Sequence, residues 1–322
     1  MSTDLVIRPL ESDELECVAQ GFASAFHVYR APAEWRRRFA PGVASAMVAH
    51  AQGDEMPLAF YGATLHDASW RGQAVQVGHI VDVFSHPDGR QAHPHVFQQT
   101  AKAFFDHFCG PGKIQVLYGF PSRGHSRLGE RYLDYRNLAA PTWHGCDLAQ
   151  LRRDMAAVSY AGRVVELSSL DCLGERIRPA NADWLHFDMS AAAMVRRFPL
   201  GGQAGYRAFA LFRTAADELL GIAIVRVIGD TAWLMSLHAA QPALAVGLWT
   251  RLVPSLQATG ARRAVTMISP AHHLGAVLPE LGFVTTDAAL AVVPTYRVFD
   301  DSLDAIALGH HFSYDLFHMD IL

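Results

Sequence analysis

The sequence lacks a long apolar run and an excess of either charge, and each absence excludes a class of protein. No uninterrupted apolar stretch reaches the ~18 residues that a membrane-spanning helix needs. The chain opens without a basic region followed by an apolar run, so we expect no signal peptide and a cytoplasmic location. The formal net charge of -4 gives no long-range attraction to nucleic acid or to an anionic membrane, and we expect neither as a partner.

Cysteine is also scarce, and the motifs of several common enzyme classes are missing. The four cysteines, Cys17, Cys109, Cys146 and Cys172, stand far apart with no Cys-x-x-Cys spacing, which indicates reduced thiols rather than a disulfide framework. There is no phosphate-binding P-loop and no dinucleotide fingerprint. Ser122 follows Gly-Phe-Pro and lacks the flanking glycines of a nucleophile elbow.

What the sequence does contain is ample apolar material for two cores. The chain has 322 residues, of which 51% are hydrophobic and 18% charged, so two domains are the first expectation. Helix and strand signals are weakest between about residues 150 and 176. We therefore predict an N-terminal domain of residues 1–160 and a C-terminal domain of residues 161–322.

Both halves show the same loose order of strands and helices. In the first, we predict strands at 5–9, 45–51, 57–65, 73–84 and 114–120, helices starting at Asp13 and Pro32, a polar loop at 85–95 and an amphipathic helix at 96–108. In the second, we predict helices at 191–198, 242–259 and 271–281, strands at 206–213, 219–228, 231–237 and 262–268, and a final β-rich stretch through Val298. This mixture predicts an α/β (α+β, mixed-sheet) protein.

Three short segments resemble motifs of the acyl-CoA N-acyltransferase (GNAT) superfamily. Residues 81–90, Val-Asp-Val-Phe-Ser-His-Pro-Asp-Gly-Arg, resemble its fourth strand and following loop. Residues 117–122, Leu-Tyr-Gly-Phe-Pro-Ser, resemble a fifth strand that ends in Gly-Phe-Pro, and residues 278–283 are similar to the Leu-Gly-Phe that ends the last helix. The resemblance implies two tandem acyl-CoA N-acyltransferase-like domains, with the candidate active site in the first.

The resemblance also implies where acetyl-CoA, or another acyl-CoA, would bind as co-substrate. In that fold two parallel strands splay apart, the pantetheine arm pairs with them, and the pyrophosphate lies at the N-terminus of the next helix. The implied residues are Val83, Phe84 and Ser85 for pantetheine, and Arg90, Gln91, Ala92, His93, His95 and Val96 for pyrophosphate.

This segment departs from the superfamily pattern, which is Arg or Gln, two residues, Gly, one residue, then Gly or Ala. His93 and His95 occupy the two small-residue positions, and Pro94 removes an N–H donor. In the second half Gln241 is kept but Leu244 replaces the expected glycine. We expect the second half to be structural or to shape the acceptor site.

Amine acylation needs a base for the ammonium and an acid for the departing thiolate. We predict Asp82 as the base; strand alternation would turn His79 to the opposite face, where packing is its simpler role. The superfamily's acid is often a tyrosine after the fifth strand, which implies Tyr132, with Tyr135 beside it. His86, His93 and His95 lack the further ligands of a zinc set, so no metal is predicted.

The predicted function is acyl-CoA-dependent N-acyl transfer, with acetyl passing to an amine of a small molecule by direct attack. Two alternatives stay open. A non-catalytic binding or scaffolding protein could keep the fold and lose the pyrophosphate site, as the substitutions at His93 and His95 suggest. An acyl carrier protein could present the pantetheine instead, and a homodimer is a further open possibility.

Overall fold

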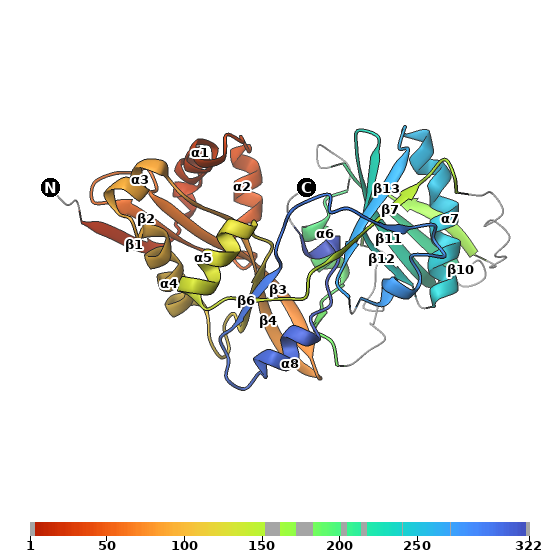
Figure 1. Ribbon diagram of the computed structural model, residues 1–322. Helices are drawn as coiled ribbons and strands as arrows, with labels where there is room; N and C mark the ends of the chain where they lie inside the picture. Colours follow the sequence, from red (N-terminus) through yellow and green to blue (C-terminus); the bar gives the residue numbers. More distant parts are fainter. Residues whose placement is uncertain are drawn as a thin grey trace. The chain divides into compact units, whose positions relative to one another are not determined.

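The computed structural model describes residues 4–151, 162–171, 183–200, 205–213, 218–239, 241–270 and 272–319. The chain divides into two compact units, each built on its own sheet (Figure 1). Unit 1 comprises Met1–Leu138 and Val292–His310, and unit 2 comprises Ala139–Ala291 and His311–Leu322. The predicted mixed α/β class is confirmed. No helix among the described residues is long and apolar enough to cross a lipid bilayer.

The sheet of unit 1 has the strand order β1-β2-β3-β4-β5-β15-β6 and is antiparallel except for the β4–β5 pair. Its strands are β1 (Leu5–Pro9), β2 (Ala44–Ala51), β3 (Ala59–Trp70), β4 (Gln73–Ser85), β5 (Val116–Gly119), β6 (Arg136–Asn137) and β15 (Thr295–Val298). Its helices are α1 (Leu15–Phe26), α2 (Pro32–Arg38), α3 (Pro87–Ala92), α4 (Val96–Phe108), α5 (Arg123–Leu133) and α8 (Ala305–His310), with a short 3₁₀ turn at Ser12–Glu14.

Alternation along the strands places a hydrophobic cluster on each face of this sheet. Val48 and Phe60 pack against Val18, Phe22 and Trp35 of α1 and α2. On the other face, Met47 and Tyr61 pack against Phe104 and other residues of α4. The two layers of helices thus hold β4, which carries the predicted site, at the centre of unit 1.

The sheet of unit 2 has the order β14-β7-β13-β12-β11-β10-β8, again with one parallel pair, β12–β13. Its strands are β7 (Thr142–Asp147), β8 (Gly162–Leu167), β10 (Tyr206–Arg213), β11 (Leu219–Ile228), β12 (Thr231–Ala239), β13 (Arg263–Ile268) and β14 (Val284–Thr286). Unit 2 also contains β9 (His186–Phe187), α6 (Ala191–Arg197), α7 (Pro242–Ala258) and 3₁₀ turns at His273–Ala276 and Leu316–His318. The fully buried Trp249 and Leu252 of α7 lie in the core over this sheet.

The two units exchange strands along the chain. β7 follows β6 in sequence but lies between β13 and β14 in the sheet of unit 2, whereas β15 lies between β5 and β6 in the sheet of unit 1. The observed division therefore differs from the predicted halves of 1–160 and 161–322. Strand partners far apart in sequence leave no local signal, and residues 152–161 and 172–182 of the expected boundary lie outside the described residues.

Two local predictions are wrong. The expected loop 85–95 contains α3, which Pro87 begins at a position where its missing N–H costs nothing. The predicted helix 271–281 forms only the 3₁₀ turn His273–Ala276 and further turns, because Gly275 and Pro279 both disfavour a continuous helix.

Candidate active site

The candidate site of unit 1 begins where β4 and β5 stop pairing. Their parallel ladder joins Val77 to Val116, Gly78 to Leu117 and His79 to Tyr118. β4 then continues to Ser85, whereas β5 ends at Gly119 and its other edge is taken by β15. Among the described residues, no strand pairs with this edge of residues 80–85. The predicted pantetheine residues Val83, Phe84 and Ser85 all lie on it.

A β-bulge shapes the same stretch of β4. The register with β3 passes from Gly62–Val81 to Phe60–Phe84, so three steps on β4 face two on β3. Asp82 lies in the bulge with a φ of 55°, a left-handed conformation that aspartate tolerates better than most residues. The bulge breaks the simple alternation from which His79 and Asp82 were predicted to face opposite ways.

Asp82, the predicted base, is held between two arginines. Its side chain is only 4% exposed; Arg30 Nη1 lies 2.5 Å from Oδ1, and Arg38 Nε lies 2.5 Å from Oδ2. The guanidinium of Arg30 also lies 4.9 Å from the centre of the Phe22 ring. Both carboxylate oxygens are thus engaged in ion pairs. The role of Asp82 as base stays a prediction.

The sequence alone did not predict that Arg30 and Arg38 pair with Asp82. Arg36, Arg37 and Arg38 together suggest a solvated face of a short helix, and Arg36 and Arg37 are indeed exposed. Arg38, however, is directed to β4. Nothing in the sequence links Arg30 with Asp82, which lies 52 positions away. The packing role expected for His79 is confirmed, because its ring is 3% exposed and stacks on Tyr118 at 4.7 Å.

Part of the segment predicted to bind pyrophosphate forms helix α3, so some of its backbone N–H groups are already hydrogen-bonded. The N–H of Arg90 donates to the His86 carbonyl, and that of His93 donates to the Gly89 carbonyl. Gln91 and Ala92 are exposed on the same helix. The N–H of Val96, the first residue of α4, likewise donates to the His93 carbonyl, so the backbone donors of α4 left for an anion are those of Phe97 and Gln98.

The N-terminus of α4 retains the properties of an anion site. His95 is its N-cap residue but makes no side-chain cap hydrogen bond, and the first turn holds no acidic residue. Next to it, His93 Nε2 is buried and has no hydrogen-bond partner. An unsatisfied ring nitrogen beside the positive end of a helix dipole fits a pyrophosphate oxygen. Within the described part of the chain, no group of histidine, cysteine, aspartate or glutamate side chains could hold a metal ion.

The two tyrosines differ sharply in their surroundings. Tyr135 is half-buried, its hydroxyl contacts that of Tyr61, and desolvation raises its pKa well above the ordinary value. Tyr132 lies on α5, is 40% exposed, and has the guanidinium of Arg131 5.2 Å from its ring centre. Tyr132 thus stays the predicted acid, and the structure shows no contact between it and Asp82.

The corresponding place in unit 2 is filled by the chain itself. The parallel β12–β13 ladder ends at Trp233–Val265. Farther along β13, Ile268 pairs with Thr142 on one edge and with Asp315 on the other. The C-terminal segment therefore lies where an added strand would pair. Leu244, in place of the expected glycine, is 5% exposed and belongs to the core.

No protein-family model and no curated protein matches the sequence. Solved structures do. A conserved protein of Enterococcus faecalis V583 described as a probable N-acyltransferase shares 10% identity over 92% of this chain and 73% of its own, with a TM-score of 0.68. A GCN5-related N-acetyltransferase from Kribbella flavida shares 17% identity over 95% of this chain and 73% of its own, with a TM-score of 0.63.

A third similar structure is itself a tandem protein. The tandem GNAT protein from the clavulanic acid biosynthesis pathway shares 15% identity, covers 92% of this chain and 98% of its own, and has a TM-score of 0.57. Likeness at such identities establishes the fold and not the reaction. The chain therefore has the predicted fold, that of the GCN5-related acyl-CoA N-acyltransferases in tandem arrangement.

Proposed function

We propose that unit 1 is an acyl-CoA-dependent N-acyltransferase that passes an acyl group, acetyl in the first instance, to an amine of a small molecule. The observation that carries this proposal is the end of the β4–β5 ladder at His79–Tyr118, beyond which β4 continues to Ser85. An extended ligand can pair with a strand edge of this kind as another strand would.

Each part of the co-substrate has a matching group in unit 1. Val83 to Ser85 would hold the pantetheine arm, and His93 Nε2 with the first turn of α4 would hold the pyrophosphate. The thioester supplies an activated acyl group. The amine nitrogen bonds to the acyl carbon as the carbon–sulfur bond breaks; a base takes the nitrogen's proton, and Tyr132 protonates the thiolate.

Calorimetry with acetyl-CoA tests this proposal, and two histidine variants sharpen it. If His93 donates to the pyrophosphate, His93→Gly weakens acetyl-CoA binding about tenfold, the effect of losing roughly 1.4 kcal/mol. His107→Gln is the control, because His107 is exposed in the last turn of α4, at the end opposite the proposed site. Tighter binding by His93→Gly would show instead that the ring obstructs the site.

The non-catalytic alternative also has an observation in its favour. The N–H groups of Arg90 and His93, which the superfamily pattern assigns to pyrophosphate, are hydrogen-bonded to carbonyl groups in and around helix α3. A protein of this kind would give neither heat nor a thermal shift with millimolar acetyl-CoA. That result, obtained with protein whose cooperative unfolding shows it to be folded, would reject the acyltransferase proposal.

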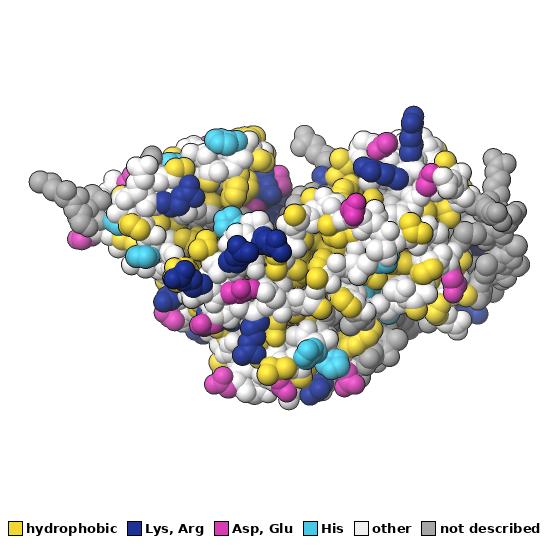
Figure 2. Space-filling view, in the orientation of Figure 1, with side chains coloured by type: hydrophobic (Ala, Val, Ile, Leu, Met, Phe, Trp, Pro, Cys, Tyr) yellow, Lys and Arg dark blue, Asp and Glu magenta, His cyan; other side chains and the backbone are white. Residues whose placement is uncertain are grey.

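Presentation of pantetheine by an acyl carrier protein is favoured by the surface of α5. Arg123, Arg127 and Arg131 recur every fourth residue, so they form one exposed basic stripe, and Figure 2 shows basic side chains over this helix. An acidic carrier protein would complement this stripe. This version predicts faster acetyl transfer from an acetylated carrier protein than from acetyl-CoA. The difference in rate should disappear in Arg127→Glu and persist in the control variant Arg213→Glu.

A further inference from the structure

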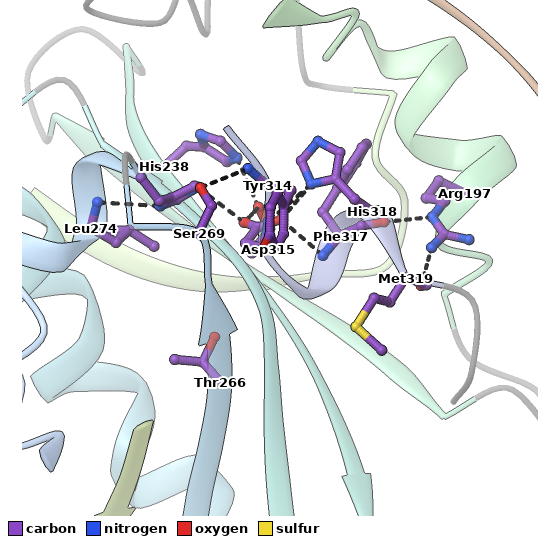
Figure 3. A network of polar contacts seen from close by, with 12 residues as sticks. Arg197, His238, Thr266, Ser269, Leu274, Tyr314, Asp315, Phe317, His318 and Met319 are labelled. Atoms are coloured by element: carbon purple, nitrogen blue, oxygen red, sulfur yellow. Dashed lines mark hydrogen bonds and ion pairs between the residues drawn. The ribbon is translucent and has the colours of Figure 1, made fainter. Parts of the chain in front are cut away.

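Unit 2 contains a cavity of about 60 Å³ next to its C-terminal segment. Histidine and aromatic side chains line it together with Asp315; among them are Trp184, Phe187, His238, His272 and His273. Figure 3 shows the polar network that joins several of these residues. The C-terminal segment that fills the strand gap in unit 2 thus also builds one wall of this cavity.

Asp315 organises the network and is itself only 1% exposed. Oδ1 accepts from the Phe317 N–H at 2.9 Å and lies 3.0 Å from His318 Nδ1. Oδ2 accepts from Ser236 Oγ at 3.1 Å and lies 3.5 Å from His272 Nε2. Burial raises the pKa of this carboxyl, but its interaction with His318 and the nearby imidazoles more than reverses the effect, so it is ionised.

The single proton of Ser236 fixes the state of His238. The Asp315 carboxylate can only accept, so the Ser236 hydroxyl donates to it. The other contact of this hydroxyl, 2.7 Å from His238 Nε2, must then be a hydrogen bond donated by His238. A neutral His238 therefore carries its proton on Nε2, and Nδ1 keeps a lone pair. No other hydrogen bond of the His238 ring is found among the described residues.

Of the remaining imidazoles of the wall, those of His272 and His273 add no positive charge at neutral pH. His272 Nδ1 accepts from the Leu274 N–H at 3.3 Å, which leaves Nε2–H directed to Asp315. Burial lowers the pKa of His238 to about 4 and that of His272 to about 3, although the Asp315 charge opposes the effect. Burial lowers the pKa of His273 as well. Arg197, the one arginine labelled in Figure 3, donates to the Phe317 and Met319 carbonyls.

The cavity thus combines a buried negative charge, a histidine lone pair and aromatic surface. We propose that it is a binding site for a small primary ammonium ion, whose N–H donates to His238 Nδ1 and whose apolar part lies against Trp184 and Phe187. The charge of Asp315 and the aromatic faces favour a cation, whereas a carboxylate or phosphate would meet like charge. This inference is independent of the acyltransferase proposal.

The test uses n-butylammonium, n-butanol and n-butyrate as probes on the full-length chain. Calorimetry and ¹⁵N imidazole NMR should show n-butylammonium binding at least tenfold tighter than n-butanol, with n-butyrate weakest and with a shift of the His238 Nδ1 resonance. His238→Gln should weaken n-butylammonium binding at least tenfold. His144→Gln, which changes a half-buried histidine of β7 outside the cavity, should leave it unchanged.

Several results would overturn the inference. Equal binding of n-butanol and n-butylammonium would show that charge plays no part, and an unshifted His238 resonance would place the ion elsewhere. Preference for n-butyrate would reverse the assigned charge of the site. The NMR titration of the unmodified protein decides the matter even if His238→Gln fails to fold, and acetyl-CoA binding serves as a separate readout of unit 1.

Discussion

Replacing Asp82 by asparagine should destabilise unit 1 markedly, because the carboxylate ties α2 and the segment after α1 to β4. The Asp82 side chain is 4% exposed, and its partners Arg30 and Arg38 are 23% and 15% exposed. Removing one member of a buried ion pair costs roughly 3–5 kcal/mol. Here the two arginines keep some contact with water, so we expect Asp82→Asn to lower the free energy of unfolding by about 2–3 kcal/mol.

Urea unfolding measures this loss, and Trp35 of α2 is a suitable fluorescence probe because it is 1% exposed. A double-mutant cycle with Arg38→Gln isolates the energy of that pair, for which we expect a coupling of about 1–3 kcal/mol. Glu218→Gln provides the control. Its partner Arg213 lies at 2.8 Å, but the two side chains are 51% and 55% exposed, so the loss should stay below about 1 kcal/mol.

The same variant separates a structural role for Asp82 from a catalytic one. If Asp82→Asn unfolds within about 0.5 kcal/mol of the original protein, the ion pairs do not hold unit 1 together and the reasoning fails. Loss of acyl transfer with unchanged stability would establish Asp82 as the base. Loss of stability with a full rate per folded molecule would exclude that role.

Two further predictions follow from unit 2 and from the strand exchange. His272 and His238 are neutral when folded, with pKa values of about 3 and about 4, whereas in the unfolded chain both take up a proton below about pH 6.5. Urea unfolding should therefore show stability falling between pH 6.5 and 5 by up to about 2 kcal/mol for each histidine, and His272→Gln should remove its share of the fall. Circular dichroism should show that residues 1–160 alone do not fold, because β15 is then missing between β5 and β6. A chain that joins residues 1–138 to residues 292–310 by a short linker should fold, since the Leu138 N–H already donates to the Pro294 carbonyl.

Local patterns predict most of the elements that surround the site. Alternation and 3.6-residue periodicity indicated β4 and α4, and the structure places them at Gln73–Ser85 and Val96–Phe108. The Gly-Phe-Pro after β5 and the Leu-Gly-Phe at residues 281–283 indicated the fold that the structural likeness confirms. These features depend on short stretches of sequence, in which neighbouring residues carry the signal.

The features that sequence reasoning missed depend on distant partners. The positive φ of Asp82 follows from a register shift against β3, and its ion pair with Arg30 joins residues 52 positions apart. The place of β15 in the sheet of unit 1 depends on pairing with β5, about 180 residues earlier, in a register that no local pattern encodes. Contacts of Asp315 with Ser236 and Ile268 have the same origin.

In unit 1 no described strand pairs with the edge of β4 beyond the β4–β5 ladder, whereas in unit 2 the C-terminal segment pairs with β13 at the corresponding place. This contrast suggests a last experiment, in which the chain is truncated after Phe312. Tyr314, Leu316, Phe317 and Met319 are each at most 3% exposed, so their burial contributes roughly 6–12 kcal/mol, as much as the whole stability of many domains. Unit 2 should then lose its cooperative unfolding transition, while unit 1 keeps its own.

A peptide of residues 311–322, added in trans, should restore that transition, because Tyr314 and Asp315 pair with Ser269 and Ile268 as a strand would. Differential scanning calorimetry of the truncated chain, with and without the peptide, makes the measurement. A truncated unit 2 that unfolds within about 2 kcal/mol of the original and binds acetyl-CoA would show the reverse: the segment would be a removable plug in a second co-substrate site rather than part of the core.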